Sequence, residues 1–488
     1  MNPTNSLTFR DALYIAGEWS VSTDREWLEV ENPATQESIG RVPLAREDDV
    51  ERAVAAAVEL HKAGHWRATE LSERAKTLNT IADAIERRAS DFEAIYTLDQ
   101  GGVSSFAGFT AATAAAIFRD TALLAEQLDL GPTRRDTLTG SVYVSREAVG
   151  PVAAIVPWNA PLVLAAVKIA PALMAGCPVV VKVSPETPLV SFILAEAIAE
   201  AGLPAGSVSF LPGGRELGQF LISLPGIKNI SFTGSTGAGQ KVMATAIEHM
   251  TRVTLELGGK SAALVLEDAD PAEFAPMLAY GCTMQAGQVC TTQSRILVPE
   301  SKREEWMAAL TTAFRNLVVG DPTDPSTGVG PLVSRAQRDR VEEFVTTAKN
   351  DGATVLTGGK RPSGTRFERG YWYEPTLLTG TTPDMQINRE EVFGPVITVE
   401  AYDDLEAGIA AVNDTEFGLS NGIFTLDTDK ALALAPRLES GAVAINSFGP
   451  NITAPFGGYK MSGVGREGGI EGIHEFLETK QVNLPPAK

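Results

Sequence analysis

The stretch that decides the fold runs from residue 150 to residue 183 and reads GPVAAIVPWNAPLVLAAVKIAPALMAGCPVVVKV. Residues 152–156 and 179–183 are short apolar runs with the length of buried strands, and residues 162–174 between them have the length of a helix. We therefore predict a strand, a helix and a second strand. This is the repeating unit of a parallel α/β sheet.

The same stretch is strongly apolar, so a membrane span has to be considered. Prolines and polar residues interrupt it at Pro157, Asn159, Pro161, Lys168 and Pro171. A membrane-spanning helix needs about 18 or more uninterrupted apolar residues. The interruptions leave no such run, and we expect no transmembrane helix here.

The alternation continues along the chain. The next predicted strands are residues 208–211, 227–232 and 252–257, separated by predicted helices at 189–201, 216–223 and 236–249. A second series of predicted strands follows at residues 262–266, 295–298, 354–357, 396–401 and 443–445. Strands alternating with helices of about ten residues indicate doubly wound parallel sheets. We thus predict an α/β fold with two doubly wound Rossmann-like domains.

The part upstream of residue 150 has a different pattern. Residues 1–30 suggest short strands, and helical periodicity covers most of residues 48–128, with a stop at Gly101-Gly102. Residues 141–145 then alternate as an edge strand. A short excursion of this kind is a candidate subunit contact.

The length, net charge and cysteine count of the chain argue against several classes of protein. A chain of 488 residues needs two or three domains. A formal charge of −20 argues against nucleic acid and anionic membranes as partners, because both attract basic surfaces. Three cysteines form no disulfide framework, and the N-terminus does not resemble a signal peptide. We expect a cytoplasmic protein.

Cys290 is a candidate nucleophile. It follows Gly287-Gln288-Val289, and a glycine lets a backbone N–H approach a ligand closely. A cysteine attacks as the thiolate, which forms where the surroundings lower its pKa. A free cysteine is more often a small apolar core residue. We give that interpretation to Cys177 and Cys282.

Two polar residues lie where ligands gather in α/β sheets, beyond the carboxyl ends of strands. Asn159 follows the first predicted strand, and its amide could donate a hydrogen bond to a developing oxyanion. Glu256 lies at the end of the strand over residues 252–257 and could act as a general base with a raised pKa. A turn asparagine and a solvated strand end are the alternatives.

The segment from Phe232 to Gly239 reads FTGSTGAG and joins a predicted strand to a predicted helix. Free backbone N–H groups and the helix dipole suit a phosphate there, although a plain glycine-rich connection is also possible. No GxGxxG motif follows any strand. The four histidines form no metal-ligand pattern, so no metal site is predicted.

Taken together, seven motifs resemble those of the aldehyde dehydrogenase superfamily, and the resemblance covers nearly the whole chain. Their order and separations leave little room for coincidence. They are Pro157-Trp158-Asn159, Val181-Lys182-Val183, Phe232-Thr233-Gly234-Ser235-Thr236, Leu255-Glu256-Leu257-Gly258-Gly259-Lys260-Ser261, Gly287-Gln288-Val289-Cys290, Glu391-Val392-Phe393-Gly394-Pro395, and Pro455-Phe456-Gly457-Gly458-Tyr459-Lys460 with Ser462-Gly463.

The resemblance implies oxidation of an aldehyde to a carboxylic acid with NAD(P). Cys290 would attack the aldehyde, and the Asn159 amide with the Cys290 N–H would hold the oxyanion. Loss of hydride would leave a thioester, which water activated by Glu256 would hydrolyse. Lys168 resembles the lysine that supports this proton path.

The resemblance also implies a set of cofactor-binding residues. Lys182 would bind the adenosine ribose, Ser235 the pyrophosphate, and Glu391 with Phe393 the nicotinamide end. The full set is Ile155, Pro157, Trp158, Lys182, Ser184, Glu186, Gly214, Phe232, Gly234, Ser235, Leu257, Glu391 and Phe393.

The domain organisation implied by the resemblance has three parts. Residues 1–125 and 149–258 would form the NAD(P)-binding domain, and residues 259–461 the catalytic domain. Residues 126–148 and 462–488 would form a bridging, oligomerisation segment. Homodimers or homotetramers are usual in the family.

Cofactor choice and substrate size depend on single positions. Many family members carry a glutamate three residues after the equivalent of Lys182, where this chain has Pro185 followed by Glu186. We expect NAD because Glu186 keeps a negative charge nearby, with NADP as the alternative.

Ala160 and Val167 stand where relatives that use small aldehydes often have aromatic rings, so we expect a medium-to-large hydrophobic aldehyde.

Two rival functions would share the fold. A CoA-acylating semialdehyde dehydrogenase commonly lacks the general-base carboxylate, whereas Glu256 is present here. A non-catalytic structural or binding protein would be expected to lose Cys290, Glu256 or Asn159, and all three are present. Hydrolytic aldehyde oxidation is therefore favoured.

Overall fold

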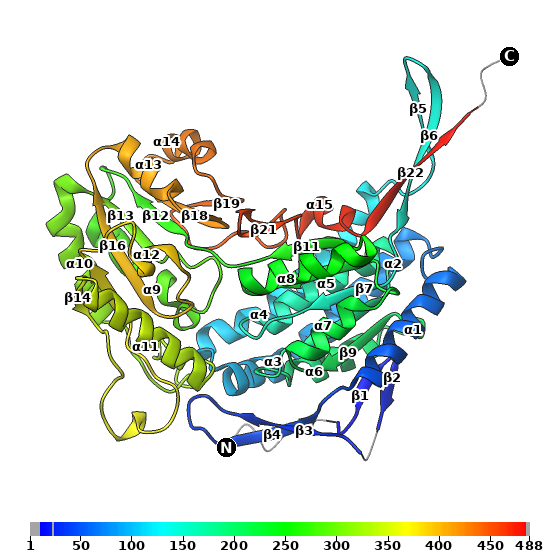
Figure 1. Cartoon of the computed structure of the whole chain (residues 1–488), viewed down its shortest axis with the longest axis horizontal. Coiled ribbons are helices and arrows are strands. Elements are labelled where there is room, and N and C mark those ends of the chain that lie inside the picture. The colour runs from blue at the N-terminus through cyan, green and yellow to red at the C-terminus, as the bar shows by residue number, and fades with distance from the viewer. Residues whose placement is uncertain (1–9, 22–23, 485–488) are drawn as a thin grey trace.

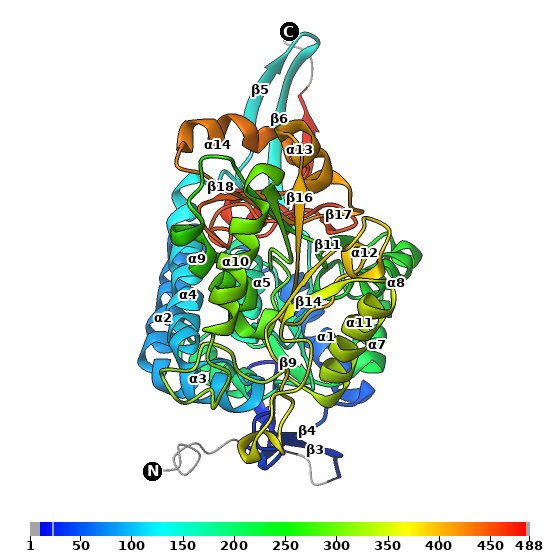
Figure 2. The same cartoon turned by 90° about the vertical axis from the view of Figure 1, so that its left-hand side faces the viewer.

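The computed structural model describes residues 10–21 and 24–484. The chain folds into two α/β lobes that lie side by side, and a narrow β-arm projects from one end (Figure 1). The first lobe is built on an eight-stranded sheet and the second on a seven-stranded sheet. The view turned by 90° shows the arm rising above both lobes (Figure 2).

The first lobe confirms the predicted alternation. Its sheet has the order β2-β1-β9-β8-β7-β10-β11-β21, and the five central strands run parallel. These are β7 (Val152–Ile155), β8 (Val179–Val183), β9 (Val208–Pro212), β10 (Asn229–Thr233) and β11 (Arg252–Glu256). Three short strands extend the sheet in antiparallel fashion: β1 (Leu13–Ile15), β2 (Glu18–Ser20) and β21 (Gly463–Val464).

Helices cover both faces of this sheet because its central strands are apolar on both sides. Ala154 and Val181 pack into one core, whereas Ala153 and Val180 pack into a second core. Alternate residues of a strand point to opposite faces, which accounts for the division. The helices are α1 (Glu47–Ala63), α2 (Leu71–Arg87), α3 (Ala89–Ile95), α4 (Ser104–Leu123), α5 (Pro161–Ala175), α6 (Val190–Ala199), α7 (Arg215–Ser223) and α8 (Thr236–Ala246).

The second lobe contains a sheet of order β14-β15-β16-β13-β12-β18-β19, parallel except for β14. Its strands are β12 (Ala262–Val265), β13 (Arg295–Pro299), β14 (Thr354–Thr357), β15 (Thr376–Thr379), β16 (Val396–Tyr402), β18 (Ser420–Phe424) and β19 (Ala442–Ile445). Its helices are α9 (Pro271–Thr283), α10 (Arg303–Arg315), α11 (Arg335–Asn350), α12 (Gln386–Arg389), α13 (Leu405–Asn413) and α14 (Thr428–Leu434).

Two strands of the second lobe were not predicted from the sequence. β15 has only four residues, between Pro375 and Gly380. β18 begins with Ser420-Asn421-Gly422, and both polar side chains are buried. Neither strand shows a polar and apolar alternation or a long apolar run, so periodicity could not detect them.

The arm is a three-stranded antiparallel sheet of β5 (Thr133–Thr137), β6 (Gly140–Ala148) and β22 (Leu477–Asn483). Strand β22 pairs with β6 from Leu477 opposite Ala148 to Asn483 opposite Val142. The residues just before it lie on the first lobe, where β21 joins the sheet edge and α15 (Gly469–His474) packs on α5. The C-terminal segment therefore serves both the lobe and the arm.

The remaining short strands form two antiparallel pairs outside the large sheets. β3 (Trp27–Glu31) pairs with β4 (Ser38–Pro43), and β17 (Phe417–Gly418) pairs with β20 (Tyr459–Lys460). Within the described part of the chain, no helix combines the length and the apolar character that a membrane crossing requires.

Candidate active site

A cavity of about 270 Å³ lies between the two lobes, and both Asn159 and Cys290 line it. The first lobe contributes the ends of β7, β10 and β11, and the second lobe contributes the cysteine loop and α11. The lining residues are Pro157, Trp158, Asn159, Thr233, Gly234, Ser235, Leu257, Gly258, Cys290, Gln337, Arg340, Glu391 and Phe393. Nine of the sequence-predicted site residues thus converge here.

The loop that carries Cys290 has an unusual backbone. Helix α9 ends at Thr283, and Gln285, Ala286 and Gly287 then take left-handed conformations with φ of 52°, 54° and 69°. A Cβ at Gly287 would lie 2.2 Å from the carbonyl oxygen of Gly394. Only glycine permits this approach. The glycine was expected to bring a backbone N–H close to a ligand, but the close approach that the structure shows is to another backbone segment.

Cys290 is partly exposed, whereas Cys177 and Cys282 are fully buried in the core. Burial, together with the nearby carboxylates of Glu391 and Glu256, raises the pKa of the Cys290 thiol to about 12. The thiol is therefore protonated in this state, and a base or a change in its surroundings has to generate the thiolate.

Asn159 is 6% exposed and is oriented by the cysteine loop. Its Nδ2 donates a hydrogen bond of 3.0 Å to the carbonyl oxygen of Gln288, two residues before Cys290. A side-chain amide nitrogen carries two hydrogens. One N–H is thus held by Gln288, and the second is available to an oxyanion formed at Cys290.

Glu256 ends β11 and is 3% exposed. Neither carboxylate oxygen has a hydrogen-bond partner. Burial raises the pKa of Glu256 well above its usual value, and the neighbouring Glu467 raises it further, while Lys168 and Arg466 act in the opposite direction. A buried carboxyl group with a raised pKa is suited to general-base catalysis near neutral pH.

Lys168 does not line the cavity but lies fully buried behind it. Its Nζ donates to Glu467 Oε1 at 2.5 Å and to Ser231 Oγ at 3.1 Å. Ser231 Oγ also donates to the same oxygen of Glu467, at 3.2 Å. Sequence reasoning missed both partners. Glu467 is 299 residues from Lys168 and stands in no motif, so only the fold reveals the contact.

The nicotinamide-side candidates, Glu391 and Phe393, are held by the second lobe. Phe393 has φ 58°, its ring contacts Trp158 edge to face at 5.3 Å, and Gln337 Nε2 donates to its carbonyl oxygen at 2.7 Å. Glu391 Oε1 accepts the Gly259 N–H at 3.1 Å. Burial raises the pKa of Glu391 to about 7. Backbone strain of the kind seen at Phe393 clusters at ligand sites.

The other predicted cofactor residues lie at the carboxyl edge of the first sheet, outside the lining of this cavity. Ile155 pairs laterally with Lys182 on one side and with Phe232 on the other. Ser184 Oγ donates to Glu186 Oε2. Gly214 precedes α7 in the same region. These residues extend the edge away from Cys290, as an elongated ligand would require.

Helix α8 begins at this edge with a satisfied cap. Ser235 Oγ accepts the Ala238 N–H at 3.4 Å. A Cβ at Gly234 would lie 2.6 Å from the Phe232 ring, so the turn requires glycine. The start of the helix thus faces the cavity with backbone N–H groups that favour an anion.

Four cavity residues were not predicted as site residues from the sequence: Thr233, Gly258, Gln337 and Arg340. Gln337 and Arg340 lie on α11, whose sequence is an ordinary charged helix, and nothing local marks them. Arg340 Nη2 donates to the carbonyl oxygen of Glu391 at 2.8 Å. Thr233 lies inside the predicted phosphate segment and could have been named from it.

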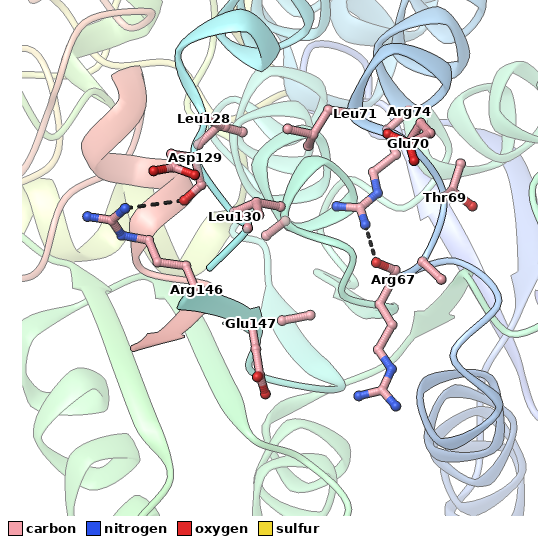
Figure 3. A pocket seen from close by; sticks show the side chains of 14 residues that line it. Arg67, Thr69, Glu70, Leu71, Arg74, Leu128, Asp129, Leu130, Arg146 and Glu147 are labelled. Atoms are coloured by element: carbon pink, nitrogen blue, oxygen red, sulfur yellow. Dashed lines mark hydrogen bonds between the residues drawn. The ribbon is translucent and has the colours of Figure 1, made fainter. Parts of the chain in front are cut away.

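A larger cavity, of about 420 Å³, lies at the foot of the arm (Figure 3). Arg146 donates to the carbonyl oxygen of Asp129, and Arg74 donates to that of Arg67 (Figure 3). Its walls carry both signs of charge, and it contains none of the predicted site residues.

Among residues 10–21 and 24–484, no cluster of three histidine, cysteine, aspartate or glutamate side chains could hold a metal ion.

Comparison with known proteins gives the family. The aldehyde dehydrogenase family model matches residues 19–482. The chain belongs to the aldehyde dehydrogenase family. The predicted fold class and enzyme class, an α/β aldehyde dehydrogenase, are thereby confirmed.

Curated relatives match almost end to end. The chain is 39% identical to geranial dehydrogenase of Castellaniella defragrans, over 97% of this chain and 98% of that protein. It is 38% identical to a chloroplastic betaine aldehyde dehydrogenase of Beta vulgaris, over 96% and 95%.

Solved aldehyde dehydrogenases have the same fold. The Mycobacterium tuberculosis enzyme complexed with NAD+ superposes with a TM-score of 0.95 at 40% identity, covering 98% of this chain and 99% of that one. The Staphylococcus aureus betaine aldehyde dehydrogenase complexed with NAD+ gives a TM-score of 0.96 at 35% identity, covering 99% and 96%.

Proposed function

We propose that this aldehyde dehydrogenase oxidises a hydrophobic aldehyde to its acid with NAD, using Cys290, Asn159 and Glu256. The observation that carries the proposal is the single cavity lined by both Cys290 and Asn159, whose amide is fixed by the cysteine loop. Glu256 ends β11 and directly precedes Leu257, which lines the same cavity.

The residues present fit a dinucleotide. The start of α8 offers backbone N–H groups, and the edge from Lys182 to Phe232 is long enough to continue the site. Glu391 and Phe393 would hold the nicotinamide end, Ser235 the pyrophosphate, and Lys182 the adenosine ribose. The cofactor, when bound, supplies the acceptor for the substrate hydride.

The chain's own residues perform the remaining steps. Glu256 takes the proton of the Cys290 thiol and passes it to solvent, and the resulting thiolate adds to the aldehyde carbon. The free N–H of Asn159 with the Cys290 backbone N–H stabilises the oxyanion. After hydride leaves, the acyl group remains on sulfur as a thioester. Glu256 takes a proton from water as it attacks, and the acid departs as the thiol is restored. The buried Lys168–Glu467 pair acts on the pKa of Glu256, and the resemblance assigns Lys168 to the support of its proton path.

The cofactor preference rests on Glu186. It accepts a hydrogen bond from Ser184. Burial lowers the pKa of Lys182, and the charge of Glu186 acts in the opposite direction. A carboxylate at this edge would repel a 2′-phosphate, so we expect NAD to be favoured over NADP. Equal turnover and similar Michaelis constants with the two cofactors would contradict this preference.

The hydrophobic substrate class is supported by helices α4 and α5, which pack together. Ala160 and Val167 are small, and residues 104–118 of α4 carry no charged side chain, although Asp120 of α4 lines a small cavity together with Val167. A cationic aldehyde would need an acidic partner to offset its desolvation. We expect geranial dehydrogenase to be the better guide to substrate than betaine aldehyde dehydrogenase, and Asp120 is the acidic residue that would favour a cationic aldehyde instead.

An aldehyde panel tests the whole proposal. Acetaldehyde, hexanal, geranial and betaine aldehyde would be assayed with NAD and with NADP, following the absorbance of the reduced nicotinamide. We expect the highest kcat/KM for geranial with NAD. No turnover of any aldehyde would refute the function. Higher efficiency with acetaldehyde than with aldehydes of six or more carbons would refute the substrate class. Product analysis with and without CoA would detect acyl transfer.

We also propose a homodimer or homotetramer that assembles through the arm, in a cytoplasmic setting that suits three free thiols. Strands β5 and β22 are the two edges of the arm, and β19 is an edge of the second sheet. Exposed edges favour pairing with another chain. Light scattering at micromolar concentration would contradict the proposal if the mass were that of a monomer, 51.7 kDa.

A further inference from the structure

Tyr96 lies directly behind the proposed oxyanion amide, on a segment that none of the motifs includes. It opens the turn η2 (Tyr96–Gln100), five residues of π-helix between α3 and α4. Its side chain is 2% exposed, and its hydroxyl donates a hydrogen bond of 3.3 Å to the backbone carbonyl oxygen of Asn159. Single π-helical turns are rare and frequently occur at functional sites.

The turn is shaped to admit the Tyr96 ring. A Cβ at Gly102 would lie 2.0 Å from Tyr96 Cε1, so any other residue there would displace the ring. Phe106 packs against the opposite side, with ring centroids 6.1 Å apart. Burial raises the pKa of Tyr96 well above its usual value, so the hydroxyl remains protonated and can donate. The ring has one position, and its hydroxyl has a fixed direction.

The segment that carries Asn159 has no regular secondary structure and is anchored by side chains instead. The carbonyl oxygen of Trp158 accepts the Thr187 hydroxyl at 3.1 Å, and the carbonyl oxygen of Asn159 accepts Tyr96. On the other side, the Asn159 amide donates to Gln288. The two ends of the residue are thus held by different lobes.

Further contacts connect the π-helical turn to the loop that fixes Gln288. Gln288 Oε1 accepts the Val333 N–H at 3.0 Å, and Gly330 in the same loop packs on Gly101, the residue after the π-helical turn. A Cβ at Gly330 would lie 2.3 Å from the Gly101 carbonyl oxygen. The turn therefore contacts the loop that fixes Gln288, while Tyr96 itself fixes Asn159.

We propose that Tyr96 is a positioning residue for the Asn159 amide, acting through its hydrogen bond to the Asn159 carbonyl oxygen. The inference rests on the proposed role of Asn159 as an oxyanion donor. Without the hydroxyl, the Asn159 backbone loses an anchor on the first-lobe side. Its free N–H then points less accurately at the oxyanion, while the cofactor residues keep their places.

The test is Tyr96→Phe, which keeps the ring and removes the hydroxyl. Loss of this hydrogen bond should lower kcat about twofold to thirteenfold, which is about 0.5–1.5 kcal/mol at about 1.36 kcal/mol for each factor of ten. The affinity for NAD, measured by titration, should change less than twofold. Tyr402→Phe is the matched control, because the Tyr402 hydroxyl also donates to a backbone carbonyl, that of Val265, at 2.7 Å. Tyr402 lies in the core of the second lobe.

A double-mutant cycle separates positioning from general support of the fold. If Tyr96 acts through Asn159, Tyr96→Phe should lower kcat in the wild-type enzyme but not in Asn159→Ala, where no amide remains to be oriented. Thermal midpoints of all variants would be measured alongside, and Tyr402→Phe should retain wild-type kcat.

Two results would overturn the inference. One is a wild-type kcat for Tyr96→Phe, and the other is an equal fold-loss from Tyr96→Phe in both backgrounds. A failure of the proposed function is distinguishable, because it would appear as no aldehyde oxidation by the wild-type enzyme or as full activity of Asn159→Ala.

Discussion

Gly457 lies where a single methyl group would press on the proposed general base. A Cβ there would stand 2.8 Å from Glu256 Oε1, 2.6 Å from the Gly465 carbonyl oxygen and 2.9 Å from Arg466 Cδ. Ordinary contact begins at 3.4 Å, so the carboxylate would have to move by about 0.6 Å. The Gly465 backbone is fixed next to β21 and cannot easily move away.

For Gly457→Ala we therefore expect a loss of both activity and stability. A displacement of 1 Å at a catalytic group can cost about a hundredfold in rate, so a shift of about half that size should lower kcat about tenfold. Overpacking a fixed backbone contact costs about 1–3 kcal/mol, which should lower the thermal midpoint.

The assay is stopped-flow detection of reduced nicotinamide followed by the steady state. If the methyl displaces the base alone, the first turnover should remain fast while thioester hydrolysis slows, so a burst should appear. Gly449→Ala is the control, because a Cβ at Gly449 would meet nothing within 4 Å. A Gly457→Ala enzyme with wild-type kcat and no burst would refute the placement of Glu256 as the base.

Three further substitutions test the site. Cys290→Ser should abolish oxidation while NAD binding, measured by calorimetry, changes less than twofold, and retained activity would exclude Cys290 as the nucleophile. Glu256→Gln should let the acyl-enzyme accumulate to a level that mass spectrometry detects, and wild-type turnover would contradict its role. Glu391 has a pKa raised to about 7, so the stability it contributes is present below about pH 4.5 and is lost as the pH rises through 7. Glu391→Gln should therefore raise the free energy of unfolding relative to wild type by an amount that grows from about pH 4.5 to pH 7 and then levels off, reaching about 1–2 kcal/mol after allowance for partial exposure. A constant difference across that range would show that Glu391 does not titrate there.

The sequence predicted the parts of the fold that repeat. Residues 179–183 form β8 with the predicted bounds, because a short run of four valines and Lys182 between helices has few alternatives in an α/β chain. The sequence did not predict β18, whose Asn421 is buried and accepts the Ala262 N–H. In the sequence alone, a polar residue such as Asn421 is typical of a loop. Only the structure shows that its side chain is buried and paired with a neighbouring strand.

The same distinction applies to the site. Asn159, Glu256 and Cys290 could be named because each stands in a motif at the end of a strand or after a glycine. Glu467 and Tyr96 could not, because each acts through one long-range contact and has an unremarkable neighbourhood in the sequence. A sequence motif can reveal a residue only when the residues next to it in the chain are also restricted. Glu467 and Tyr96 are restricted by residues that are close in space but distant in the chain.

The return of the chain to the first lobe after β19 has a consequence for how the enzyme is made. Strand β21 pairs with β11, with Leu255 opposite Val464, and Glu467 follows shortly after. Pairing across such a long separation is slow to form. During synthesis, the first lobe must therefore wait with an open sheet edge and an unneutralised Lys168 until the ribosome has passed residue 467. A nascent chain stalled before that point would hold its nucleophile and oxyanion donor but would lack the partner of its buried lysine, and we expect it to be a substrate for chaperones rather than an early catalyst.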